Sequence, residues 1–194
     1  MKKLKDKVII TGFGRAGTTF LVMLLTRLGL DTGFKPYKEA YFSELRAGCE
    51  KVTIFDEDYK ASKKKMDESP EILKAPGYSF FIKNYVQSGL VKIRHVIIPV
   101  RDLKESTKSR LSVGLRWCIE AHEGEEEQEK VLAEALGRAV EACVMCKIPC
   151  TILRFPDLVK NVDYLYSQLS PIFKINKNSF NKVFKELQII NRKV

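Results

Sequence analysis

Three glycines, a permanent cation and two adjacent hydroxyls stand close together near the start of the chain. They are Gly12, Gly14, Arg15, Gly17, Thr18 and Thr19. Glycines let the backbone curve closely around a ligand, and arginine and threonine side chains donate hydrogen bonds to phosphate oxygens. This combination is typical of a loop that binds a phosphate group.

The elements around these residues fit that interpretation. Residues 8–10 form a short apolar run, and residues 20–30 carry apolar side chains at helical spacing, so the glycines fall between a predicted strand and a predicted helix. The first amides of a helix lack partners within it, and the helix dipole attracts anions to that end. We expect Thr18 and Thr19 to cap this helix and to bind phosphate oxygens.

The spacing of Gly12, Gly17 and Thr19 almost follows the Walker A pattern G-x-x-x-x-G-K-[ST]. Thr18 stands at the lysine position, and the nearest cation is Arg15. Because that lysine normally reaches the β- and γ-phosphates, the departure argues against use of ATP or GTP. A glycine turn that only joins strand to helix is the alternative without a function.

The segment Arg15-Ala16-Gly17-Thr18-Thr19-Phe20-Leu21 resembles the 5′-phosphosulfate loop of the sulfotransferase family, roughly [KR]-[ST]-G-[ST]-[ST]-x-L, and departs from it only at Ala16. The cosubstrate of that family is 3′-phosphoadenosine 5′-phosphosulfate. The resemblance implies that the loop binds its 5′ side and that Arg15 stabilises charge during transfer. The implied loop residues are Gly14, Arg15, Ala16, Gly17, Thr18 and Thr19.

A second resemblance lies farther along the chain. Residues 95–102 predict a strand that ends in Arg101-Asp102, and Ser109 follows eight residues after the arginine, in the next predicted helix. Sulfotransferases bind the 3′-phosphate with such an arginine and serine, so the resemblance implies this role for Arg101 and Ser109. Phe155 stands where the family often has the tyrosine of Tyr-Glu-Asp-Leu, which implies a face for the adenine.

Two further residues complete the implied active site. Lys74 ends the strand predicted over residues 71–74, on the edge where α/β sheets bind ligands. The segment also resembles a Lys-x-Pro segment of carbohydrate sulfotransferases, whose lysine lines the sulfuryl site. Residues 33–41 loosely resemble a bacterial sulfotransferase segment, which implies Glu39 as the base. An edge lysine and a solvent-facing glutamate are the competing interpretations.

The length, composition and charge of the chain limit which folds and which partners are expected. The 194 residues are 45% hydrophobic and 30% charged, with 34 Lys and Arg against 24 Asp and Glu, a net charge of +10. We expect one α/β domain over residues 1–194, with helices on both faces of a mostly parallel, P-loop-like sheet. The charge favours anionic partners. The basic residues are spread along the chain without an aromatic-interleaved motif, so nucleic acid is not the expected partner.

No apolar run approaches the length of a membrane span and no secretory signal is evident, so we expect a cytoplasmic protein without a membrane partner. The five cysteines argue against a disulfide framework. We expect Cys143, Cys146 and Cys150 to be buried thiols rather than a zinc site, and no metal in the mechanism. His95 and His122 are expected to be structural or solvated.

Together these features predict a sulfotransferase that acts on a hydroxyl or amine of a carbohydrate or small molecule. The alternatives are a P-loop nucleotide or small-molecule kinase and a non-catalytic nucleotide-binding protein. A late Gly-x-x-Gly-x-Trp segment, which closes over the 3′-phosphate in many sulfotransferases, is missing from this sequence. The sequence leaves the acceptor and the oligomeric state open.

Overall fold

The computed structural model describes residues 6–36, 41–42, 47–48, 59–112 and 124–192. Its centre is a four-stranded sheet in the order β4-β1-β5-β6, in which every neighbouring pair is parallel. Ile9 pairs with Leu73 on one side and with Val96 on the other. The strands are β1 (Lys7–Ile10), β4 (Ile72–Lys74), β5 (Ile93–Val100) and β6 (Cys150–Arg154).

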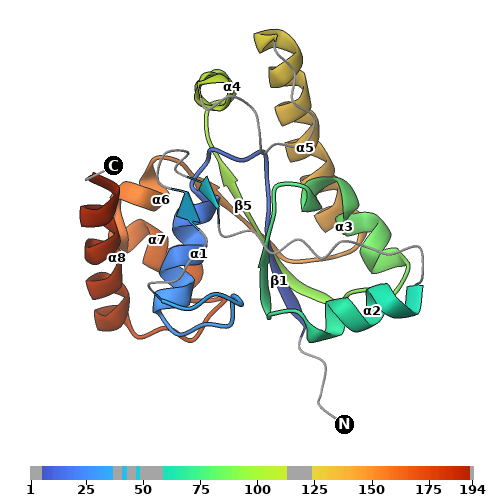
Figure 1. Cartoon of the computed structure of the whole chain (residues 1–194), viewed down its shortest axis with the longest axis horizontal. Coiled ribbons are helices and arrows are strands. Elements are labelled where there is room, and N and C mark those ends of the chain that lie inside the picture. The colour runs from blue at the N-terminus through green and yellow to red at the C-terminus, as the bar shows by residue number, and fades with distance from the viewer. Residues whose placement is uncertain (1–5, 37–40, 43–46, 49–58, 113–123, 193–194) are drawn as a thin grey trace.

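Helices cover both faces of the sheet, so the predicted α/β fold is confirmed (Figure 1). Helices α1, α7 and α8 pack on one face, and α2, α3 and α5 pack on the other, while α4 follows directly after β5. The helices are α1 (Thr18–Arg27), α2 (Tyr59–Glu68), α3 (Tyr78–Gln87), α4 (Leu103–Leu111), α5 (Glu125–Met145), α6 (Asp157–Lys160), α7 (Val162–Leu169) and α8 (Lys177–Arg192). A small antiparallel pair joins β2 (Tyr41–Phe42) to β3 (Ala47–Gly48).

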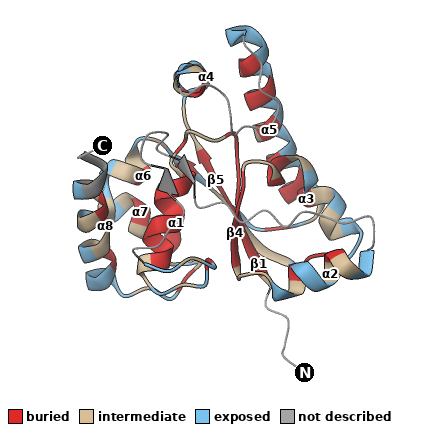
Figure 2. Cartoon of the chain, in the orientation of Figure 1, coloured by how far each residue is buried: buried red, intermediate tan, exposed pale blue. Residues whose placement is uncertain are grey.

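The side chains of β1 point alternately to the two faces of the sheet, which explains why helices cover both faces. Val8 and Ile10 belong to the core under α1 and α8, whereas Ile9 belongs to the core under α3 and α5. All three side chains are buried, and Figure 2 shows the same burial along the inner strands and α1. A parallel strand that is buried on both faces has a continuous run of apolar residues in its sequence. The apolar run at residues 8–10 therefore predicted this strand.

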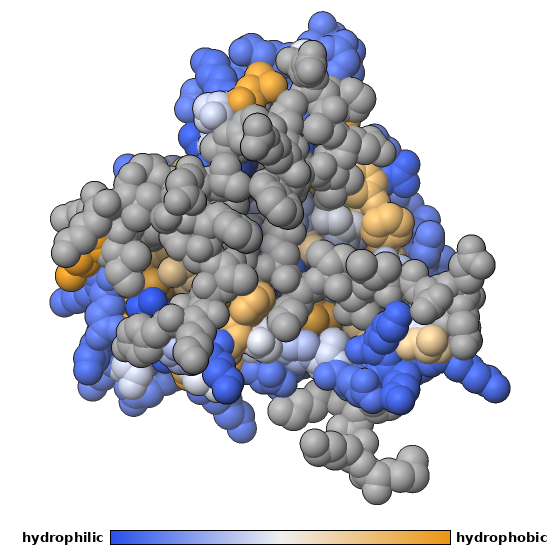
Figure 3. All heavy atoms as spheres, in the orientation of Figure 1, coloured by the Kyte–Doolittle hydropathy of each residue, from blue (hydrophilic) through white to orange (hydrophobic). Residues whose placement is uncertain are grey.

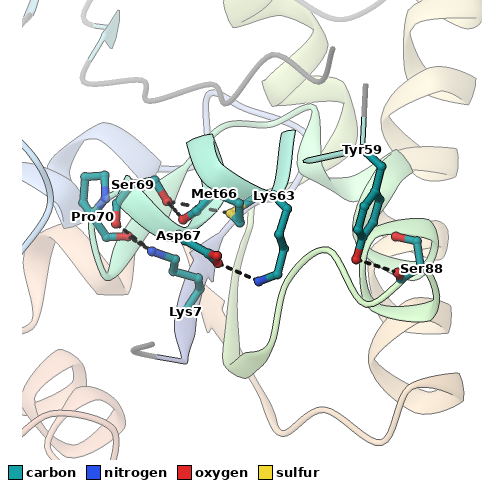
Figure 4. Close-up of polar contacts among 8 residues, drawn as sticks. All are labelled: Lys7, Tyr59, Lys63, Met66, Asp67, Ser69, Pro70 and Ser88. Atoms are coloured by element: carbon teal, nitrogen blue, oxygen red, sulfur yellow. Dashed lines mark hydrogen bonds and ion pairs between the residues drawn. The ribbon is translucent and has the colours of Figure 1, made fainter. Parts of the chain in front are cut away.

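Three elements were missed by the sequence analysis, namely α2, the short α6 and the β2–β3 pair. The basic run Lys60 to Lys65, a pattern that favours a solvated face, lies in α2, which buries only Ser62 and Met66. Figure 4 shows how this helix is held by polar contacts, among them Tyr59 Oη to the carbonyl of Ser88 at 3.2 Å. The strand expected over residues 52–55 lies outside the described residues.

Lys7 fixes the connection between α2 and β4. Lys7 is buried as a residue, and its Nζ donates to the carbonyl oxygens of Ser69 at 2.6 Å and Pro70 at 3.1 Å (Figure 4). Burial lowers the pKa of Lys7, although the nearby carboxylates of Asp31 and Asp67 act in the opposite direction. The start of β1 thereby holds the strand that carries Lys74.

On the face drawn in Figure 3, the coloured residues are mostly hydrophilic, with small separate apolar patches. Among the described helices, none is both long enough and apolar enough to cross a membrane. Within the described ranges there is also no group of three or more His, Cys, Asp or Glu residues that could hold a metal ion.

The three neighbouring cysteines differ in exposure, which corrects one expectation. Cys143 is buried and Cys146 is partly buried, but Cys150 is exposed. The prediction of a buried thiol was wrong for Cys150 because β6 is the outermost strand, and no strand of the described sheet covers its far side. Burial raises the pKa of the Cys143 thiol to about 12, so this thiol stays protonated at neutral pH.

The environment of His95 leads us to predict that the stability of the protein depends on pH. Its Nε2 lies 2.9 Å from Thr151 Oγ1, and burial, with a smaller effect from the charge of Arg94, lowers its pKa below the ordinary value of 6.5. The unfolded chain therefore binds a proton more readily, so this contribution to stability is complete above about pH 6.5 and is lost on acidification through the lowered pKa. Urea unfolding at pH 7.5 and 5.5 should show a smaller pH effect in His95→Gln than in the wild type. Equal pH effects in the two proteins would contradict this assignment.

Candidate functional site

The loop between β1 and α1 has the backbone conformation that its glycines suggested. Gly12, Gly14 and Gly17 have φ values of 130°, 71° and 91°, and Arg15 between them has a φ of 55°. A left-handed conformation costs a residue with a side chain about 1–2 kcal/mol. Arg15 adopts it with its guanidinium held by another part of the chain.

The start of α1 is left without a side-chain cap because Gly17 is the N-cap residue. The carbonyl of Gly17 accepts the first helical hydrogen bond, from Leu21 N at 3.1 Å. Thr18 and Thr19 are the first two residues of the helix itself, and both are buried. The expectation that these threonines cap the helix was therefore wrong, since the glycine in the left-handed conformation already occupies that position.

Arg15 connects the two segments that resembled sulfotransferase motifs. Its Nε donates to Ser109 Oγ at 3.0 Å, across 94 positions of sequence. Ser109 lies on α4, which starts at the end of β5, and Arg15 lies in the loop after β1. This hydrogen bond joins the two implied phosphate-binding segments directly.

Arg101 extends this cluster toward the edge of the sheet. Its Nη1 donates to the carbonyl of Arg15 at 3.4 Å, and its guanidinium lies 4.9 Å from the centre of the Phe155 ring. The side chain of Arg101 is 22% exposed and forms a 3.5 Å ion pair with Glu105. Two guanidinium groups, a hydroxyl and an aromatic ring therefore lie together where β1, β5 and β6 end.

Lys74 lies at the same end of the sheet, as the last residue of β4, and is 3% exposed. Its neighbours are tied to the glycine loop by buried hydroxyls. Thr11 Oγ1 lies 3.0 Å from the carbonyl of Ala75 and 3.0 Å from Ser79 Oγ, which accepts a hydrogen bond from Gly12 N at 3.2 Å. The predicted place of Lys74 at the carboxyl edge is confirmed, while its role is untested.

One predicted site residue lies outside the described residues, and two residues that contact the glycine loop were not predicted. Glu39, the implied base, lies outside the described residues. The sequence analysis did not single out Ser79 or Arg110, whose Nη1 donates to the carbonyl of Phe13 at 3.2 Å. A signal for Arg110 lies in the structure of α4, whose buried residues are the polar Ser106, Thr107 and Arg110.

Comparison with known proteins extends the fold assignment. No protein-family model and no curated protein matches the sequence. Among solved structures, the chain is similar to a sulfotransferase domain from the curacin biosynthetic pathway, with a TM-score of 0.54 and 12% sequence identity. The match covers 90% of this chain and 76% of that chain. The chain has a sulfotransferase-like fold. At this identity the likeness establishes the fold alone, and the site must be argued from its own residues.

Proposed function

We propose that the protein transfers a sulfuryl group from 3′-phosphoadenosine 5′-phosphosulfate to a hydroxyl or amine acceptor. The observation that carries the proposal is the 3.0 Å hydrogen bond between Arg15 and Ser109. It brings together two segments that sequence resemblance assigned, independently, to the two phosphate ends of one nucleotide. The similarity of the fold to a sulfotransferase domain agrees with this assignment.

The residues present fit such a nucleotide chemically. The uncapped start of α1 and the positive backbone angles before it favour an anion, here the 5′-phosphate. Arg101 supplies a planar guanidinium and Ser109 a hydroxyl for the 3′-phosphate. The Phe155 ring, beside Arg101, offers an aromatic face for the adenine. These residues follow the carboxyl ends of three different strands, namely β1, β5 and β6.

The proposed reaction is an in-line displacement at sulfur. The acceptor oxygen or nitrogen forms a bond to sulfur, the bond between sulfur and the phosphate oxygen breaks, and the acceptor gives its proton to a base. Negative charge grows on the departing phosphate oxygen, where a fixed cation lowers the barrier. Arg15 keeps its proton and therefore acts electrostatically. We assign the base to Glu39 and the lining of the sulfuryl site to Lys74.

Calorimetric titration with 3′-phosphoadenosine 5′-phosphate and, separately, with magnesium-ATP tests the nucleotide site. We expect preferential binding of the bisphosphate. Arg101→Ala should weaken that binding by at least about tenfold, because a hydrogen bond to a charged group contributes about 1.5–3 kcal/mol.

Arg138→Ala is the matched control for this titration. Arg138 also stacks on a phenylalanine, Phe80 at 5.7 Å, and pairs with the carboxylate of Glu134, but it lies on α5. Its substitution should leave bisphosphate binding unchanged. Preference for magnesium-ATP would replace the proposal with a kinase function. Binding of neither nucleotide would refute both.

A further inference from the structure

We infer that Arg110 is a positioning residue that sets the shape of the anion loop, residues 11–17 between β1 and α1, by holding the carbonyl of Phe13. Arg110 does not have to touch the ligand for this, since it acts through the loop backbone. The inference deepens the proposed function and rests on the anion loop that it assumes. The first evidence is placement, because Arg110 is 3% exposed and its Nη1 lies 3.2 Å from the Phe13 oxygen.

Phe13 is the point at which the loop needs outside support. It lies between Gly12 and Gly14, whose φ values of 130° and 71° belong to conformations that few residues other than glycine adopt. Glycine backbones are easily rotated, so local preferences do not fix the direction of the Phe13 carbonyl. The ring of Phe13 is 1% exposed and packs with Ala16 and Leu132. The ring and the carbonyl thus anchor the loop at two places.

Consecutive residues of α4 hold the loop on both sides of Gly14. Arg110 binds Phe13, and Ser109 accepts the hydrogen bond from Arg15. The residue before this helix, Asp102, caps its start, because its carboxylate accepts a hydrogen bond from Glu105 N at 3.0 Å. Because Asp102 adjoins Arg101, one rigid helix joins the loop to the proposed 3′-phosphate site. A change at Arg110 is therefore expected to reach the anion through the backbone.

The chemistry of the α4 interface favours a functional role over simple packing. Ser106 and Thr107, with Arg110, make up the buried residues of the helix. The hydroxyls of Ser106 and Thr107 have no hydrogen-bond partner in the part of the chain that the structure describes. Apolar side chains would pack here at lower cost, because a buried polar group without a partner is destabilising. The interface instead keeps a guanidinium, which remains charged and adds positive potential beneath the loop.

Inorganic pyrophosphate is the probe that tests this inference, because it reports on the anion loop without the nucleoside. Calorimetric titration of the whole protein should show at least about tenfold weaker binding in Arg110→Met, similar to the loss of metal affinity when a group that orients a metal ligand is removed. Arg110→Lys should have an intermediate affinity, because lysine keeps the charge but lacks the planar fork of donors.

Arg94→Met is the matched control. Arg94 also donates from Nη1 to a backbone carbonyl, that of Ile172 at 3.0 Å, and pairs with Glu71 at 2.7 Å, but it lies on β5 near the opposite end of the sheet. Urea unfolding of each variant measures its stability separately from binding. We expect Arg94→Met to lose stability and to retain wild-type affinity for pyrophosphate. If Arg110 had a merely structural role, Arg110→Met would give this same result.

The outcomes separate this inference from the proposed function. Wild-type pyrophosphate affinity in Arg110→Met, or equal losses in Arg110→Met and Arg94→Met, would overturn the inference. If Arg110→Met does not fold, Arg110→Lys decides, and wild-type affinity there overturns it as well. Weaker pyrophosphate binding in the Arg110 variants, in a protein that does not prefer 3′-phosphoadenosine 5′-phosphate, would uphold the inference and refute the nucleotide assignment.

Discussion

Gly17→Ala should destabilise the protein and impair anion binding together. A Cβ at this position would lie 2.7 Å from Leu158 Cδ1, and the backbone has a φ of 91°. Left-handed strain costs about 1–2 kcal/mol and overpacking about 1–3 kcal/mol, so the free energy of unfolding should fall by about 2–5 kcal/mol. Because Leu158 is fully buried, its side chain has little room to move away. Urea unfolding and pyrophosphate titration measure the two effects.

Gly29→Ala separates the two causes. Gly29 has a φ of 81°, but a Cβ there would meet nothing within 4 Å, so its substitution should cost only the strain of about 1–2 kcal/mol. A double variant with Leu158→Val should lose less stability than the sum of its single changes, since the shorter side chain relieves the contact. Equal costs for Gly17→Ala and Gly29→Ala would show that the contact with Leu158 is unimportant.

Phe184→Ala should produce a second large loss of stability. Phe184 is 1% exposed on α8 and makes an edge-to-face contact with Phe20 of α1, with ring centres 5.4 Å apart. It also stacks on Phe180 at 6.3 Å. Truncating such a ring leaves a cavity and typically costs about 3–5 kcal/mol, which urea unfolding would detect. Helix α8 would lose one of its main contacts with the helix that starts at the anion loop.

Ile189→Ala is the control on the same helix. Ile189 is 56% exposed, so its truncation removes little buried area and should change stability by less than about 0.5 kcal/mol. A small loss for Phe184→Ala, similar to that for Ile189→Ala, would mean that α8 contributes little to the core. Faster amide exchange in α8 than in β1 of the Phe184 variant would locate the damage.

Much of the fold could be predicted because the elements have strong local patterns. The apolar run at residues 8–10 and the helix after Gly17 were visible in the sequence. The strand order β4-β1-β5-β6 was not predicted, since pairing between distant strands leaves no local signal. Helix α2 was missed because its lysines mask a weak apolar stripe.

The residues of the candidate site were likewise predicted only in part. Resemblance to sulfotransferase motifs selected Arg15, Arg101 and Ser109, and the structure brings these three residues together. The contact of Arg110 with Phe13 could not be predicted, because it depends on how α4 is rotated against a loop almost a hundred residues earlier. Glu39 remains a prediction from resemblance. The cap at Gly17 was misjudged because residue preferences do not reveal a positive φ.

The exposed thiol of Cys150 has a practical consequence for experiments. It lies at the amino end of β6, whereas the anion loop, Arg101 and Phe155 lie where the parallel strands finish. Once the other four cysteines are replaced, a dye or surface linker attached at Cys150 would lie at the other end of β6 from the proposed nucleotide site. An immobilised protein would then present its loop toward solution, in a single orientation suited to binding measurements on a sensor chip.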